Sequence, residues 1–259
     1  MEIKALKTRV FKENEELIPF ILKYIKKLPE NSVLVVTSKI VALAEGRTVE
    51  IDTSISHEKM RENIIRAESE YMLRTQFDHS LWMTIKDGMV MSSAGIDESN
   101  AAGKIILLPK NSFKMADKLR KDLQKKYKVK NLGVLITDSR LFPLRAGVVG
   151  AALGYAGFKG VKDYRGTIDI FGRTLKMSRT DVADSLATAA VLSMGEGREQ
   201  QPLAIITSAP IEFVEKIDKK ELMLDPRDDL YLPLFKNIGK IKNLNSKNYT
   251  NFKMLGNKD

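Results

Sequence analysis

The stretch from Leu132 to Phe158 constrains the fold more than any other part of this 259-residue chain. It begins with the apolar, mostly β-branched run Val134–Ile136, which predicts a buried strand. Asp138 and Ser139 follow at the predicted end of that strand. A carboxylate beside a hydroxyl offers the hard oxygen ligands that Mg²⁺ and Mn²⁺ prefer. The pattern therefore indicates either a metal-binding strand end or an ordinary buried strand and turn.

Glycines interrupt the apolar sequence that comes next, at Gly147, Gly150, Gly154, Gly157 and Gly160. So many glycines in an apolar run indicate close backbone approach or unusual dihedral angles, which phosphate-binding sites often need. The alternative is a glycine-rich buried strand and turn without a ligand, and the residues alone do not decide between the two.

The composition excludes several classes of chemistry. The absence of cysteine rules out disulfides, thiolate metal sites and cysteine nucleophiles. His57 and His79 have no second histidine at ligand spacing, so neither a histidine-based zinc site nor a serine–histidine triad is expected. No apolar run reaches the roughly 20 residues of a membrane span, and the N-terminus has no signal-peptide core. We therefore expect a cytoplasmic protein without a membrane partner, and its net charge of +10 favours anionic partners.

Apolar periodicity predicts a mixed α/β (α+β) fold. Strands are predicted at 2–11, 32–37, 104–108, 175–177 and 203–207, and a hairpin of 81–86 and 89–92 has a type I′ turn signature at Asp87-Gly88. Helices are predicted at 15–28, from Ser38 to near Gly46, at 56–74, at 112–130 and at 181–194, the last one capped by Ser178 or Thr180. Residues 1–240 are expected to form one unit without a readable subdomain boundary, and residues 241–259 a polar, basic tail.

Three polar segments have both an ordinary and a functional interpretation. Ser38-Lys39 opens a helix, where it fits a phosphate contact as well as a plain N-cap. Asp97 and Glu98 lie in a cluster of small and acidic residues, where a turn-capping Asp beside a solvated Glu is the ordinary interpretation. The predicted helix 112–130 carries eight basic residues, which indicate a solvated face or, as an alternative function, a nucleic-acid-binding helix: Lys114, Lys118, Arg120, Lys121, Lys125, Lys126, Lys128 and Lys130.

Six segments together resemble one family, the coenzyme F-420-0: L-glutamate ligases (γ-glutamyl ligases). The segments are VVTSKIVALAEGR (35–47), SAGIDESN (93–100), ITDSRLFPLRAG (136–147), ALGYAGFKGVKDYRG (152–166), DIFGRTL (169–175) and VADSLATAAVLSMGEGREQ (182–200). They occur in the family's order, with the 41-residue spacing between Asp97 and Asp138 intact.

The resemblance implies a ligase that uses GTP, or ATP, and two divalent metal ions, Mg²⁺ or Mn²⁺, with a monovalent cation as a further cofactor. It implies that L-glutamate is joined to an anionic acceptor carboxylate through an acyl phosphate. The acceptor is the deazaflavin coenzyme precursor or a related pterin, folate-like or peptide carboxylate. The family fold is expected to form an intertwined homodimer. A nucleotide-binding relative without catalytic activity is another alternative.

The resemblance also implies roles for individual residues. Asp97 and Asp138 are implied as ligands of one metal ion, and Ser139 and Glu196 as ligands of the second. Nucleotide contacts are implied for Ser38, Lys39, Asn100 and the loop that includes Met194, Gly195, Gly197, Arg198 and Gln200. On grounds of chemistry, candidate catalytic contacts to substrate or phosphate are Arg140, Arg145, Asp163 and Arg165, with Arg173 beside them.

Overall fold

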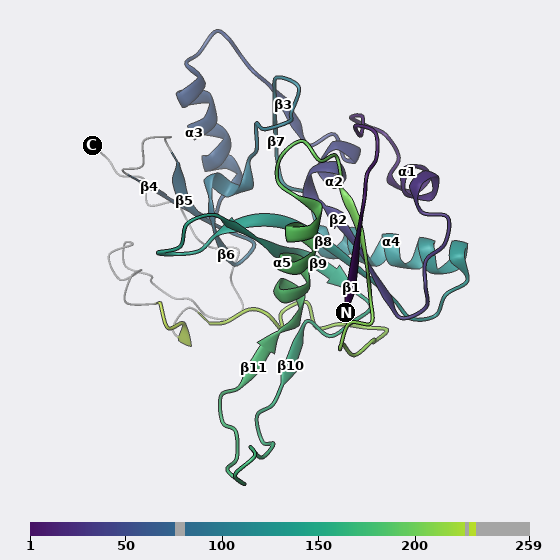
Figure 1. Ribbon diagram of the computed structural model, residues 1–259. Coiled ribbons are helices and arrows are strands. Elements are labelled where there is room, and N and C mark those ends of the chain that lie inside the picture. Colours follow the sequence, from purple (N-terminus) through teal and green to yellow (C-terminus); the bar gives the residue numbers. More distant parts are fainter. Residues whose placement is uncertain (76–80, 226–227, 232–259) are drawn as a thin grey trace. The chain divides into compact units, whose positions relative to one another are not determined.

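The computed structural model describes residues 1–75, 81–225 and 228–231, and has a mixed α/β fold, as predicted (Figure 1). The chain divides into two compact units. Unit 1 consists of residues 1–47 and 109–222, and unit 2 of residues 48–108 and those after 222. The chain passes from one unit to the other after Arg47 and again after Leu108, where the amino-acid composition marks no boundary. The expectation that residues 1–240 act as one unit stays a prediction. The expected tail, 241–259, lies outside the described residues.

Unit 1 contains a five-stranded sheet in the order β1-β12-β2-β8-β9. Its strands are β1 (Glu2–Leu6), β12 (Leu203–Thr207), β2 (Ser32–Thr37), β8 (Leu132–Leu141) and β9 (Val148–Ala156). β2 and β8 are parallel, and the other neighbours are antiparallel. The continuous apolar runs of β2 and β8 are buried because helices cover both sides of these central strands. The predicted strand 2–11 is too long, since pairing with β12 ends at Leu6.

The helices of unit 1 are α1 (Leu17–Tyr24), α2 (Ser38–Ala44), α4 (Ser112–Tyr127) and α5 (Val182–Met194). α1 is shorter at both ends than predicted, and Pro19 lies in its first turn, where a missing backbone N–H costs no helical hydrogen bond. α5 packs its alanine-rich face against Tyr155 and Phe158 in a shared core. Its N-cap is Asp181, whose side chain accepts a hydrogen bond from the Asp184 N–H, so the predicted caps Ser178 and Thr180 are wrong.

The glycines of β9 allow helices to pack closely on it. A Cβ on Gly150 would lie 2.3 Å from the Ala187 carbonyl oxygen in α5, and one on Gly154 would lie 2.4 Å from the Phe113 nitrogen in α4. A β-bulge separates these two glycines, because Ile136 pairs with Gly154 and Thr137 with Ala152. The expected close backbone approach is therefore confirmed at Gly150 and Gly154, and the groups that approach are helices of the same chain.

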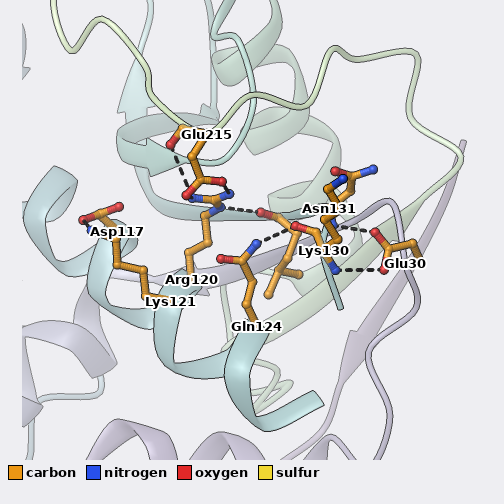
Figure 2. Close-up of polar contacts among 9 residues, drawn as sticks. Glu30, Asp117, Arg120, Lys121, Gln124, Lys130, Asn131 and Glu215 are labelled. Carbon is orange, nitrogen blue, oxygen red and sulfur yellow. Dashed lines mark hydrogen bonds and ion pairs between the residues drawn. The ribbon is translucent and has the colours of Figure 1, made fainter. Parts of the chain in front are cut away.

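The segment after β12 returns along unit 1 and is held by a buried arginine (Figure 2). Arg120 of α4 donates from Nε to the Leu132 carbonyl at 3.0 Å and from Nη2 to the Glu215 carboxylate at 2.6 Å. The Val214 N–H donates to the Gly157 carbonyl in the same region. Arg120 is thus an internal residue, so the expectation of an entirely solvated basic face is wrong at this position. Its neighbour Lys121 is exposed and pairs with Asp117.

A two-stranded arm, β10 (Val161–Asp163) and β11 (Arg179–Asp181), extends away from the sheet of unit 1 (Figure 1). The strand predicted at 175–177 is wrong, because the strand that pairs with β10 begins at Arg179. The loop that joins the two strands exposes four large apolar side chains by between 71% and 91%: Ile168, Ile170, Phe171 and Met177.

The described residues of unit 2 form two small sheets, one α-helix and a short 3-10 helix, η1 (Ser93–Gly95). β3 (Thr48–Glu50) pairs with β7 (Lys104–Ile106), and β4 (Tyr71–Arg74), β5 (Trp82–Lys86) and β6 (Met89–Ser92) form a three-stranded sheet. Positive φ angles of 52° at Asp87 and 74° at Gly88 confirm the predicted hairpin turn. The predicted helix 56–74 is partly wrong: α3 covers His57–Glu68, while Tyr71–Arg74 pairs with β5 because its apolar, aromatic residues suit a strand. Across the described part of the chain, no helix is long and apolar enough to cross a membrane.

Candidate active site

The candidate site of unit 1 lies where the parallel strands β2 and β8 reach their carboxyl ends. The pairing of these strands ends at Thr37 and Thr137, after which β8 continues beside β9 alone. Asp138 and Ser139 therefore lie within β8, not at its end as predicted, because the β8–β9 ladder extends to Leu141. The carboxyl ends of parallel strands are a common location for ligand sites.

Ser38 and Asp138 meet at this edge although 100 residues separate them. The Ser38 hydroxyl, at the first position of α2, donates to Asp138 Oδ1 at 3.0 Å. The Arg140 guanidinium donates from Nη1 to Asp138 Oδ2, also at 3.0 Å. Both carboxylate oxygens therefore accept a hydrogen bond, and the guanidinium places a positive charge beside the carboxylate.

Ser139 contacts a different part of unit 1. Side chains alternate along a strand, so Asp138 and Arg140 share one face of β8 and Ser139 occupies the other. The Ser139 hydroxyl donates to Glu196 Oε1 at 2.5 Å. Glu196 follows Gly195, which caps the end of α5. The structure thus brings together the two residues that the resemblance pairs around one metal ion.

The loop between α5 and β12 is held against the same edge by backbone hydrogen bonds. The Thr37 N–H donates to the Pro202 carbonyl, and the Thr8 N–H donates to the Gln200 carbonyl. Met194 is buried, whereas Gly195, Gly197 and Arg198 are exposed, and Lys39 is half-buried at the start of α2. Ser38 and Lys39 therefore follow β2 directly, and the loop that carries the other implied nucleotide contacts of unit 1 is joined to the end of β2 at Pro202.

Known proteins of one family match this chain. The family model described as F420-0:Gamma-glutamyl ligase matches residues 5–208. The chain belongs to this family. The coenzyme F420:L-glutamate ligase of Methanococcus maripaludis (strain C6) is 34% identical over 245 residues, which cover 89% of this chain and 97% of that protein. The enzymes of the same name from Methanocaldococcus jannaschii and Methanopyrus kandleri are 31% and 36% identical, over 82% and 69% of this chain and 90% and 75% of theirs.

Family membership confirms the resemblance drawn from the six segments, while the roles of single residues stay predictions. Asp97 and Asn100 belong to unit 2. Asp97 Oδ1 accepts from the Ser99 N–H at 2.7 Å, so the turn-capping interpretation of Asp97 is confirmed. Glu98 is not simply solvated as expected, because it forms ion pairs with His57 and Arg61. Asn100 is exposed and has a φ of 52°.

The remaining candidate catalytic residues lie apart from the Ser38–Asp138 pair in the fold of unit 1. Asp163 and Arg165 bind each other where β10 ends and the loop of the arm begins, and the guanidinium lowers the pKa of Asp163 to about 2. Arg173 is exposed in the loop of the arm, and Arg145 is exposed in the turn between β8 and β9. The structure therefore places Arg140 alone of this group beside Asp138.

The donor chemistry fits a hard divalent cation. Among the described residues, no group of three or more His, Cys, Asp or Glu side chains is arranged to hold a metal ion. However, Mg²⁺ usually keeps several water ligands and is bound by one or two carboxylates together with substrate phosphates. The oxygen atoms of Asp138, or of Ser139 with Glu196, match that mode of binding. Two metal ions and a monovalent cation stay predictions.

Two residues that support the site were missed by the sequence analysis. Asp184 and Thr188, one turn apart on α5, both bind the edge of β9. Asp184 Oδ1 accepts from the Ala152 N–H at 2.7 Å, and the Thr188 hydroxyl donates to the Gly150 carbonyl at 2.7 Å. These contacts satisfy backbone groups of an edge strand and so fix β9 beside the candidate residues of β8. Their i, i+4 spacing on a helix was the available signal.

Proposed function

We propose that this protein ligates L-glutamate to the carboxylate of a deazaflavin coenzyme precursor, using GTP and two divalent metal ions. Family membership supports the ligase class. The observation that carries the proposal is the contact between Ser139 and Glu196, the pair that the resemblance assigns to one metal ion. Near it, Ser38, an implied nucleotide contact, binds Asp138, an implied metal ligand.

In the proposed reaction, an acceptor carboxylate oxygen attacks the γ-phosphorus, the bond to the bridging oxygen breaks, and GDP leaves. The glutamate amine then attacks the acyl carbon, inorganic phosphate leaves, and the nitrogen loses a proton. Bound metal ions would neutralise phosphate charge in both steps. Asp138 and Glu196 would hold them, and the Ser38 hydroxyl orients the Asp138 carboxylate through its hydrogen bond.

The test measures glutamate incorporation into the precursor by mass spectrometry, with GTP or ATP and with Mg²⁺ or Mn²⁺. We expect a product one glutamyl residue heavier, formed with stoichiometric release of phosphate. Asp138→Asn should lower kcat by roughly 100-fold because it removes the charge that would hold a cation. Asp117→Asn, on the solvent-facing side of α4, is the matched control and should retain wild-type activity. The proposal would be refuted if the wild-type protein released no phosphate, or incorporated no glutamate, with any combination of nucleotide and metal ion.

We further propose that the protein is a homodimer in which the apolar loop of the β10–β11 arm is covered by a second copy. Family resemblance implies the dimer, and four exposed apolar side chains on one loop make a surface that monomeric proteins seldom leave in water. Phe171→Asp should shift the sedimentation coefficient towards that of a monomer. Val10→Asp, at another exposed apolar residue of unit 1, should leave a dimer. A wild-type monomer at micromolar concentration would refute this proposal.

A further inference from the structure

Arg140 has an unusual environment for a buried arginine. The residue is only 8% exposed, and its Nη1 donates a hydrogen bond to the Asp138 carboxylate. Nε and Nη2 are buried and have no hydrogen-bond partner in the part of the chain that the structure describes. Buried donors of a charged group are costly to leave unpaired, so such groups indicate a missing partner.

The unpaired nitrogens form one edge of the guanidinium. Nε and Nη2 carry two roughly parallel N–H bonds, which is the fork that binds both oxygens of a carboxylate or a phosphoryl group. Lysine lacks this geometry. The contact with Asp138 uses the other side of the guanidinium and leaves this fork open.

Arg120 provides an internal comparison. It is also buried, and all three of its nitrogens have partners: Nε binds the Leu132 carbonyl, and Nη1 and Nη2 bind Glu215. Arg120 therefore shows that the fold of unit 1 can pair every nitrogen of a buried arginine. Arg140 differs because its bidentate edge is unpaired beside the candidate site.

We propose that the Nε–Nη2 edge of Arg140 binds an oxyanion of the reaction while Nη1 stays on Asp138. The ligand presents two oxygens side by side, either a substrate carboxylate or a phosphoryl group of the nucleotide. This assignment of the anion to a substrate rests on the proposed function. Arg140 thereby aligns a reacting anion with the carboxylate of Asp138, which is a specificity-determining role.

The test compares wild type with Arg140→Lys, which keeps the positive charge and loses the fork. Calorimetric titrations use four probes separately: inorganic phosphate, GTP with Mg²⁺, L-glutamate and the deazaflavin precursor. The matched control is Arg66→Lys, because Arg66 forms an ordinary ion pair with Glu62 one turn away on α3. Thermal unfolding without ligand shows whether each variant keeps its fold, and Arg140→Gln is the second variant if the Lys variant unfolds.

We expect Arg140→Lys to weaken binding of one class of probe by roughly 10-fold or more, and Arg66→Lys to bind like wild type. Weaker phosphate and GTP binding identifies a phosphoryl group, and weaker binding of glutamate or precursor identifies a carboxylate. In turnover, KM should rise for that substrate and stay unchanged for the others. Equal binding of all probes by wild type and the folded Arg140 variant overturns the inference, as does a wild type that binds none. A wild type that binds these anions without ligating glutamate refutes the proposed function instead, and the binding comparison still decides the role of Arg140.

Discussion

The contact between Arg120 and Glu215 leads to a prediction about how unit 1 is stabilised (Figure 2). The Arg120 side chain is 3% exposed, whereas the Glu215 side chain is 73% exposed. Water already screens the charge of the exposed Glu215 carboxylate, and the amide oxygen in Glu215→Gln can still accept a hydrogen bond from Arg120, so the expected cost is small. We expect Glu215→Gln to lower the free energy of unfolding by about 1 kcal/mol, the upper end for exposed pairs.

Replacing the arginine should cost more. Arg120→Met fills much of the same volume but leaves the buried Leu132 carbonyl without its donor and frees Glu215 from α4. An unsatisfied buried acceptor costs about 1–3 kcal/mol, and the lost ion pair adds about 1 kcal/mol, so a total near 3 kcal/mol is expected. The size of the effect therefore depends mainly on the carbonyl, not on the carboxylate.

Urea unfolding followed by circular dichroism measures both variants at pH 7. Lys121→Met, on the exposed side of the same helix, is the control and should stay within about 0.5 kcal/mol of wild type. Arg120 lowers the pKa of Glu215, so the Glu215→Gln difference should be present above the ordinary carboxyl pKa and disappear as the pH falls through the lowered value. A Glu215→Gln cost equal to that of Arg120→Met would refute this reasoning.

Three further predictions concern α5 and its contacts. Gly150→Ala should lower the unfolding free energy by about 3 kcal/mol or prevent folding, because the added Cβ would lie 2.3 Å from the Ala187 carbonyl; a wild-type melting temperature would contradict this packing. Asp184→Ala should cost about 1–3 kcal/mol in urea unfolding, because it leaves the Ala152 N–H unpaired, and Asp184→Asn, which keeps an acceptor, should recover most of that loss. Loss of hydration and the nearby Asp184 carboxylate raise the pKa of Asp181 to about 7, so its charge destabilises the folded state increasingly between pH 4 and pH 7. Asp181→Asn keeps the N-cap, so it should leave the melting temperature unchanged near pH 4 and raise it by about 2–4 °C at pH 8. The expected shift is modest because residue 181 remains exposed to solvent. Equal shifts of the melting temperature at both pH values would contradict the raised pKa.

Local patterns were sufficient for elements whose burial follows from their own sequence. The apolar run of β2, the strand at 203–207 and the Asp87-Gly88 turn have one favourable local structure each, and all three were predicted with their bounds. The pattern failed where tertiary pairing decides. Tyr71–Arg74 continues the helical periodicity of 56–68, yet it forms a strand because β5 offers it a partner.

The candidate site shows the same division between local chemistry and long-range pairing. Residue types alone indicated Asp138 and Ser139, because carboxylates and hydroxyls bind hard cations, whereas Glu196 was implied only by the family resemblance. Contacts between them depend on strand register, which no local pattern contains: Ser38 reaches Asp138 only because Thr37 pairs in parallel with Thr137. The inward position of Arg140 depends on the same register.

The bulge in β9 connects the fold to the chemistry of β8. β9 has one more residue, Leu153, than β8 between Ile136 and Thr137, so the faces of β9 exchange at that point. Gly154 then faces α4, while Gly150 faces α5, and the polar side chains of α5 bind the edge beyond the bulge. Because the pairing of β8 with β9 continues past the end of β2, Asp138 and Ser139 are held in an extended backbone and must point to opposite faces. Asp138 therefore contacts the Ser38 hydroxyl and the Arg140 guanidinium, whereas its neighbour Ser139 contacts the Glu196 carboxylate. The two adjacent residues thus belong to two separate polar clusters on opposite faces of β8.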